Sequence, residues 1–202
     1  MAYKNFTLSE LKHTFHIKEQ TECLFHHITP LEETSWLKET LKRTALIPLK
    51  SEKSRSELVV MPILLELKAR NNDFFMIYSG DTLIADKPKG LIGECDFILT
   101  KNVNSYSIST PIISIVEAKK NDIEHGIDQC AAQMIGAKMV NEKEHNAIDI
   151  IYGCVTTADD WQFLKLEKDV LFIDNKKYYF ENLTLILGIF QNIIDYYKQT
   201  LK

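Results

Sequence analysis

The sequence predicts an α/β protein in which a mixed central sheet is flanked by helices. A densely apolar helical segment, three strand-like runs, a long helical segment and further strand-like runs follow one another without a break. Hydrophobic residues make up 45% and charged residues 26% of the 202 residues, which is ordinary for a chain with its own core. We expect one such domain over residues 51–202, preceded by a partly helical extension over residues 1–50.

Four segments have the apolar spacing and the flanking residues of helices. They are residues 32–41, a buried segment that begins after Ser56 and ends at residues 71–73, residues 123–144 and residues 183–201. Thr34 or Ser35 is expected to cap the first of them. Pro62 should kink the second or lie near its first turns, because proline cannot donate a helical hydrogen bond.

The strand-like runs are rich in β-branched and aromatic residues and lie between turn signals. They cover residues 74–79, 91–99, 112–119, 150–157, 161–166, 170–173 and 177–180. Turns are expected around Gly80 and Asp81 and over residues 87–90. The last three runs should form an antiparallel β-meander before the C-terminal helix.

Charge and cysteine usage exclude several classes of protein. The formal net charge of −4 argues against a protein that binds nucleic acid tightly and nonspecifically. It does not argue against a site that holds a cation, because carboxylates are suitable ligands there. No apolar run reaches the roughly 18 residues of a membrane-spanning helix, and residues 1–6 lack the apolar stretch of a secretory signal. The four cysteines form no zinc or disulfide pattern, so reduced thiols in a cytoplasm fit best.

The chemistry is expected at the end of the third strand-like run. Glu117 and Lys119 are two positions apart and leave the same face of that strand, whereas Ala118 points to the other face. Two charges at the end of an apolar strand are unfavourable unless they are paired or bind a ligand. If the preceding run pairs with this one, the carboxylate of Asp96 can approach that of Glu117.

Two carboxylates of this kind suit a hard cation such as Mg²⁺ or Mn²⁺. Such a metal would polarise a phosphate oxygen and lower the pKa of a bound water. Lys119 would hold or deprotonate that water and offset charge in the transition state. The pattern therefore indicates a metal-dependent phosphodiesterase.

An aspartate on one strand followed by Glu-x-Lys on the next resembles the PD-(D/E)xK, or restriction-endonuclease-like, nuclease superfamily. The resemblance covers about residues 54–180 and is carried by Asp96, by Glu117 with Lys119, and by the glutamines of Gln129-Cys130-Ala131-Ala132-Gln133. Together with residues 93–97, 152–157 and 161–164, these segments also resemble small standalone bacterial proteins assigned to that superfamily.

The resemblance implies an αβββαβ core and hydrolysis of phosphodiester bonds, usually of DNA. It assigns metal binding to Asp96 and Glu117 and assistance of the attacking water to Lys119. Many members add a glutamate from the helix before the sheet, where Glu57 falls, and a glutamine from the helix after the third strand, where Gln129 and Gln133 fall. Two departures stand out: Cys95 precedes Asp96 where the motif has proline, and Ala137 stands where RecB-like members have tyrosine.

Alternatives remain at each position. Glu57 could serve only as a carboxylate near a helix start, and the glutamines could be ordinary helix surface. The whole chain could be a noncatalytic nuclease-fold module for DNA or protein binding, or a subunit of a larger restriction or repair complex. A homodimer would suit double-strand cleavage, but DNA or RNA preference and endonuclease or exonuclease action are left open.

Overall fold

A mixed sheet of eight strands forms the centre of the computed structural model, which describes residues 2–72, 74–101 and 105–201. The strands are β1 (Lys18–Glu22), β2 (Phe75–Asp86), β3 (Leu91–Lys101), β4 (Ile112–Ala118), β5 (Ile150–Thr156), β6 (Asp160–Glu167), β7 (Val170–Asp174) and β8 (Tyr178–Tyr179). Their order is β1-β7-β6-β5-β4-β3-β2, and β8 pairs with β6. The β4–β5 and β1–β7 pairs are parallel and the others are antiparallel, so the predicted mixed sheet is confirmed.

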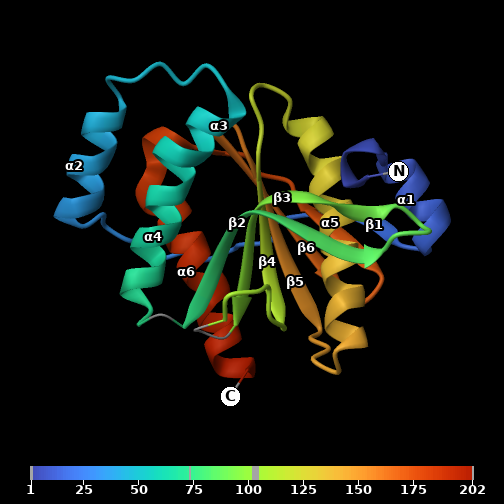
Figure 1. Cartoon of the computed structure of the whole chain (residues 1–202). Coiled ribbons are helices and arrows are strands. Elements are labelled where there is room, and N and C mark those ends of the chain that lie inside the picture. The colour runs from blue at the N-terminus through green and yellow to red at the C-terminus, as the bar shows by residue number, and fades with distance from the viewer. Residues whose placement is uncertain (1, 73, 102–104, 202) are drawn as a thin grey trace.

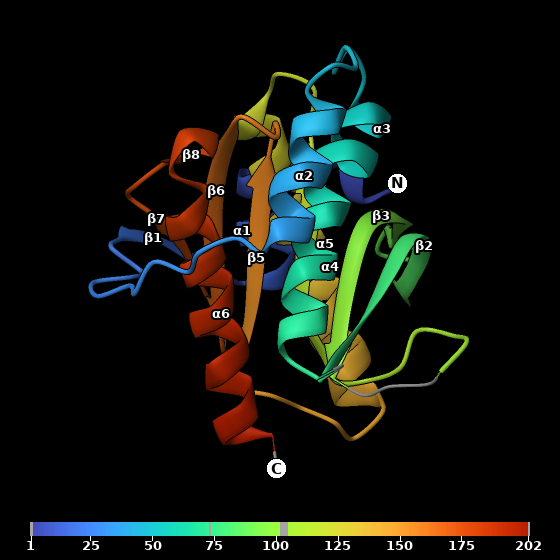
Figure 2. The same ribbon diagram turned by 90° about the vertical axis from the view of Figure 1, so that its left-hand side faces the viewer.

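Helices cover both faces of this sheet (Figure 1). They are α1 (Leu8–Phe15), α2 (Ser35–Thr44), α3 (Glu52–Arg55), α4 (Met61–Arg70), α5 (Ile123–Lys143) and α6 (Leu183–Thr200), with short helical turns η1 (Tyr3–Asn5), η2 (Ser56–Val60) and η3 (Phe180–Asn182). Helices α2, α4 and α6 lie on one face of the sheet, and α5 lies on the other face with α1 beside it (Figures 1 and 2).

Strand β4 separates two apolar clusters, one on each face of the sheet. All seven residues of β4 are buried. Ile113 and Val116 pack with the cluster formed by α4 and α6, whereas Ile112 and Ile115 pack with the cluster under α5. A strand that is covered on both faces reads as a continuous apolar run, which is why its sequence is so apolar up to Glu117.

Helix α5 is the crossover between the parallel strands β4 and β5. It begins where the Asp122 side chain accepts a hydrogen bond of 2.9 Å from the His125 amide. This cap starts the helix four residues after the end of β4, so the first turns of α5 pass over the carboxyl end of that strand. The site is built at this end.

The helix before the sheet begins earlier than expected. It was predicted to start after Ser56, but α3, η2 and α4 form one continuous helix that starts at Glu52 and ends at Arg70, followed by Asn71. The η2 segment is a π-helical turn that ends two residues before Pro62, a residue that cannot donate a helical hydrogen bond. Pro62 lies in the first turn of α4, which is one of the two predicted outcomes, whereas Asp73 lies outside the described residues.

Other elements also differ from the expectation. The turn predicted around Gly80 and Asp81 is wrong, because β2 runs through both residues and accommodates the positive φ of 69° at Gly80. The turn over residues 87–90 is confirmed. The meander is only partly confirmed, since β8 pairs with β6 and not with β7.

The first fifty residues contribute more to the fold than their sequence suggests. Strand β1 pairs in parallel with β7 and extends the sheet, although its five residues are polar and exposed. Tyr3, Phe6 and Leu11 are buried in the cluster under α5. Thr34 caps α2, as predicted.

No helix in the described ranges has both the length and the apolar character needed to cross a membrane.

Candidate functional site

Strand β4 ends in the carboxylate of Glu117, which is almost fully enclosed. Its side chain is 2% exposed. Lys119 Nζ donates to Oε1 at 2.7 Å, and Gln129 Nε2 donates to the same oxygen at 2.5 Å. Gln133 Nε2 donates to Oε2 at 2.9 Å. Hydrogen bonds of this kind offset the desolvation of a buried charge. The structure thus brings together four of the residues singled out in the sequence.

Lys119 follows β4 directly and is held by the neighbouring strand and helix. Its amide donates to the Thr156 carbonyl at 2.7 Å, which continues the β4–β5 pairing by one residue. The side chain passes close to Gly126 of α5, where a Cβ would stand 2.9 Å from Lys119 Cγ. Besides Glu117, the amine donates to Gln129 Oε1 at 3.1 Å. Its third N–H makes no hydrogen bond with the described residues and can reach a ligand.

Asp96 approaches this pair from β3. The pairing of β3 with β4 includes Phe97 opposite Val116. Beyond this pair, a side chain replaces the backbone acceptor of β3. Asp96 Oδ2 accepts a hydrogen bond of 2.7 Å from the Ala118 amide. Oδ1 accepts none from the described residues. Asp96 therefore lies beside the end of β4, where its charge acts on Glu117, as expected if the two strands pair.

The closeness of these two carboxylates changes their ionisation. Burial, followed by the negative charge of Asp96, raises the pKa of Glu117 to about 7, although Lys119 and Gln133 oppose the rise. Burial also raises the pKa of Asp96, and the hydrogen bond from the Ala118 amide opposes it. The charge of Asp96 disfavours ionisation of Glu117, and the charges of Glu52 and Glu94 disfavour ionisation of Asp96. A bound cation would relieve this repulsion.

Lys119 is a cation in this arrangement. Burial alone would lower its pKa, but the charge and hydrogen bond of Glu117 outweigh burial and raise the pKa above its ordinary value. As long as Glu117 carries its charge, the lysine enters the site as a positive charge and hydrogen-bond donor rather than as a base.

A pocket of about 390 Å³ opens onto these groups. Its charged lining residues are Lys4, Glu52, Glu94, Asp96, Glu117 and Lys119. Four carboxylates thus face two amines, and this excess of negative charge favours a cation over a free anion. A second pocket of about 390 Å³ lies beside the first and shares Glu52, Glu94 and Asp96 with it.

The structure does not bring Glu57 to Glu117. Glu57 is exposed, pairs at 3.8 Å with Lys53 and lines only the second pocket. Glu52 lines both pockets and acts electrostatically on Asp96 and Lys119. Sequence reasoning missed Glu52 because it placed the helix start one turn too late. The signal was Ser51, whose side chain caps the helix, since a carboxylate is favoured in the first turn after such a cap.

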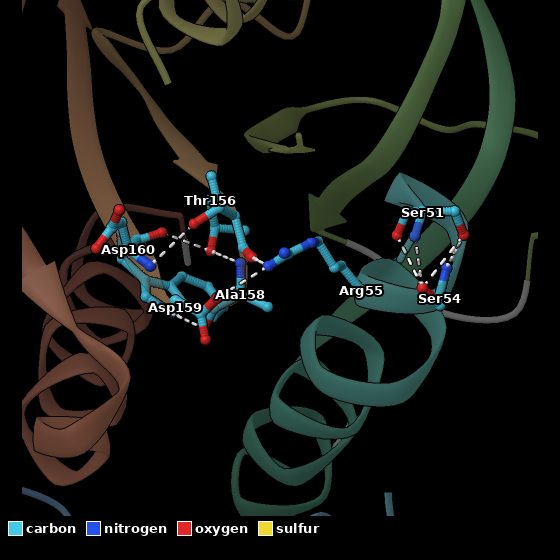
Figure 3. A network of polar contacts seen from close by, with 9 residues as sticks. Ser51, Ser54, Arg55, Thr156, Ala158, Asp159 and Asp160 are labelled. Atoms are coloured by element: carbon cyan, nitrogen blue, oxygen red, sulfur yellow. Dashed lines mark hydrogen bonds and ion pairs between the residues drawn. The ribbon is translucent and has the colours of Figure 1, made fainter. Parts of the chain in front are cut away.

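Arg55 ties the helix that carries Glu52 to the turn between β5 and β6 (Figure 3). Its Nη1 donates to the Thr157 carbonyl and, at 3.0 Å, to the Asp159 carboxylate. The Arg55 side chain is 13% exposed. Because Thr156, the last residue of β5, also holds the Lys119 amide, one short segment positions both α3 and Lys119.

The arrangement stops short of a complete metal cage. Among the residues that the structure describes, no three His, Cys, Asp or Glu side chains are grouped closely enough to hold a metal ion.

Comparison with known proteins assigns no family. No protein-family model matches the chain, and no curated protein matches it in sequence.

Proposed function

We propose that this protein is a metal-dependent nuclease that hydrolyses phosphodiester bonds, of DNA in the first place, on a restriction-endonuclease-like core. The observation that carries the proposal is the convergence of Asp96, Glu117 and Lys119 at one pocket. The order of α4, β2, β3, β4, α5 and β5 also agrees with the αβββαβ core that the resemblance implies.

The donor set suits Mg²⁺ or Mn²⁺. Magnesium is commonly bound by one or two carboxylates together with water and substrate phosphate, so a cage of three protein ligands is not required. Asp96 Oδ1 accepts no hydrogen bond from the described residues, and the three donors on Glu117 leave about one of its roughly four lone-pair positions. Asp96 and Glu117 would therefore hold the ion. Bound there, it would polarise a phosphate oxygen and acidify a water.

The other residues act directly or through these two. Lys119 would place a positive charge where the attacked phosphate gains negative charge. Its third N–H would donate a hydrogen bond to that phosphate. Gln129 and Gln133 fix both oxygens of Glu117, so that the carboxylate is oriented before substrate arrives. Glu52 adds negative charge at the pocket wall.

The test is a cleavage assay with a matched pair of variants. Lys119→Gln keeps a donor for Glu117 but removes the charge, and Lys120→Ala removes an exposed neighbouring charge. We expect wild type and Lys120→Ala to cleave labelled DNA with Mg²⁺ or Mn²⁺ and not with EDTA. Lys119→Gln should lose about 100-fold in kcat or more. A wild-type protein that is inert on every form of DNA and RNA with either metal would refute the proposal.

One observation favours a second function, that of a noncatalytic nucleic-acid-binding module. Glu117 is already neutralised by Lys119 at 2.7 Å and bonded to two glutamines. With Glu117 engaged in this way, the protein would bind nucleic acid without hydrolysing it. The same assay separates the two functions, because the binding module retains labelled DNA and leaves it intact in both metals.

A further inference from the structure

The segment Ala2–Lys4 forms one wall of the pocket that holds Glu117 and Lys119. It belongs to the part of the chain that the sequence suggested was only an extension. It lines this pocket together with residues of α3, β3 and α5 and of the end of β4, among them Glu52 and Asp96. A substrate bound at the carboxylates would therefore lie in a pocket that η1 also lines.

Tyr3 anchors this wall. Its side chain is 1% exposed and lies between β3 and α5. A Cβ at Gly93 would stand 3.2 Å from the Tyr3 ring, and a Cβ at Gly136 would overlap the Tyr3 hydroxyl. Both glycines leave room for the ring. The Leu8 amide donates to Asp128 of α5 at 3.2 Å, so the chain is held on both sides of Lys4.

Lys4 is the available amine of this pocket. It is exposed and makes no hydrogen bond or ion pair with the described residues. The other lining amine, Lys119, is engaged with Glu117 and Gln129. A phosphodiester chain that enters a pocket lined by four carboxylates is repelled unless cations meet it. Lys4 supplies such a cation at the wall of the pocket.

We propose that Lys4 is a substrate-binding residue that holds a backbone phosphate beside the one that is cleaved, and that Tyr3 positions it. This inference rests on the proposed nuclease function and names a residue of its substrate site. Phosphate contacts fix the register of a nucleic acid without reading its sequence. Lys4 accordingly contributes to affinity for any sequence, and the chemical step is left to Asp96, Glu117 and Lys119.

The experiment measures binding and cleavage separately. Fluorescence anisotropy of a short labelled DNA, single-stranded and duplex, is followed over a range of salt concentrations for wild type, Lys4→Ala, Lys4→Arg and Lys42→Ala. Lys42 is an exposed lysine of α2, on the other face of the sheet, and serves as the matched loss of one charge. Calcium replaces magnesium so that binding is measured without turnover.

We expect Lys4→Ala to weaken binding about fivefold and to reduce the slope of log affinity against log salt by about 0.7–0.9, the value of one phosphate contact. KM should rise with little change in kcat. Lys4→Arg should restore the slope, and Lys42→Ala should match wild type. Equal slopes and affinities for Lys4→Ala and wild type overturn the role of Lys4 even if the protein cleaves DNA. Binding without cleavage overturns the nuclease function alone, and a protein that binds no DNA overturns both.

Discussion

The Ala118 amide and the Asp96 carboxylate are joined by a hydrogen bond of 2.7 Å, so an ionisable side chain of β3 completes the backbone pairing of β4. Asp96 thus has a structural role in the sheet and, under the proposed function, a second role in metal binding. Substitutions that keep one role and remove the other can separate them.

Asp96→Asn keeps an oxygen acceptor for the Ala118 amide but loses the negative charge. We expect the free energy of unfolding to change by less than about 1 kcal/mol while cleavage is abolished. Asp96→Ala leaves the amide unpaired and should cost about 1–3 kcal/mol as well as activity. Urea denaturation and the cleavage assay measure the two effects, with Asp81→Asn on the exposed part of β2 as the control. Equal stability losses for both Asp96 variants would contradict this division.

Divalent cations should stabilise the folded protein, because burial raises the pKa of both Asp96 and Glu117, and neighbouring carboxylates raise both further. Starting from protein treated with EDTA, Mg²⁺ or Mn²⁺ should raise Tm. The gain is about 2.7 kcal/mol at a hundredfold excess over Kd. Differential scanning calorimetry measures it, and Asp96→Asn should lose most of it. A Tm that does not respond to either metal would argue against cation binding at this pair, whatever the protein does to DNA.

Arg55 should matter far more than an exposed arginine, because its buried guanidinium joins α3 to the turn after β5. Arg55→Met should lower the free energy of unfolding by about 2 kcal/mol. The control is Arg43→Met, which removes an exposed i,i+4 pair with Glu39 and should change stability by less than about 0.5 kcal/mol. Chemical denaturation compares the two, and similar values would show that the Arg55 contacts are not formed in solution.

Gly136→Ala should destabilise the protein, although the same change in an open helix would stabilise it by about 1 kcal/mol. The added methyl group overlaps the Tyr3 hydroxyl, so a loss of about 1–3 kcal/mol is expected. Tyr3→Phe alone should be close to neutral, since that buried hydroxyl has no partner among the described residues. Combined with Gly136→Ala, it should recover part of the loss. A double-mutant cycle without coupling would show that Tyr3 does not occupy this place.

Glu66 should make stability depend on pH at the acid end. Burial alone would raise its pKa, but the hydrogen bonds from Thr34 and Arg70 outweigh burial and lower the pKa below its ordinary value. The stabilisation is therefore present above the ordinary carboxyl range and is lost as pH falls through the lowered pKa. Wild type should exceed Glu66→Gln by about 2 kcal/mol at neutral pH, and the difference should shrink towards pH 3. A constant difference would contradict this.

The sequence predicted the central sheet well because β4 is a continuous apolar run and α5 is a long segment with helical spacing, and the buried strand led directly to Glu117 and Lys119. It placed Glu57 instead of Glu52 at the pocket because a helix start is set by a local cap, and Ser51 competes with several other polar residues nearby. Strand β1 is polar throughout, so hydrophobic patterning gave no sign of it. The role of Tyr3 depends on two glycines that lie far away in the sequence, and no local pattern reveals such a contact.

The parallel pairing of Lys18 with Val170 has a consequence for the order in which the protein folds. Contacts between residues so distant along the chain form slowly, because the intervening chain must lose its freedom first. Tyr3 reaches Gly136 by a similarly distant contact. After dilution from urea, recovery of DNA affinity is accordingly expected to lag behind recovery of helical circular dichroism, and simultaneous recovery would contradict this order of assembly.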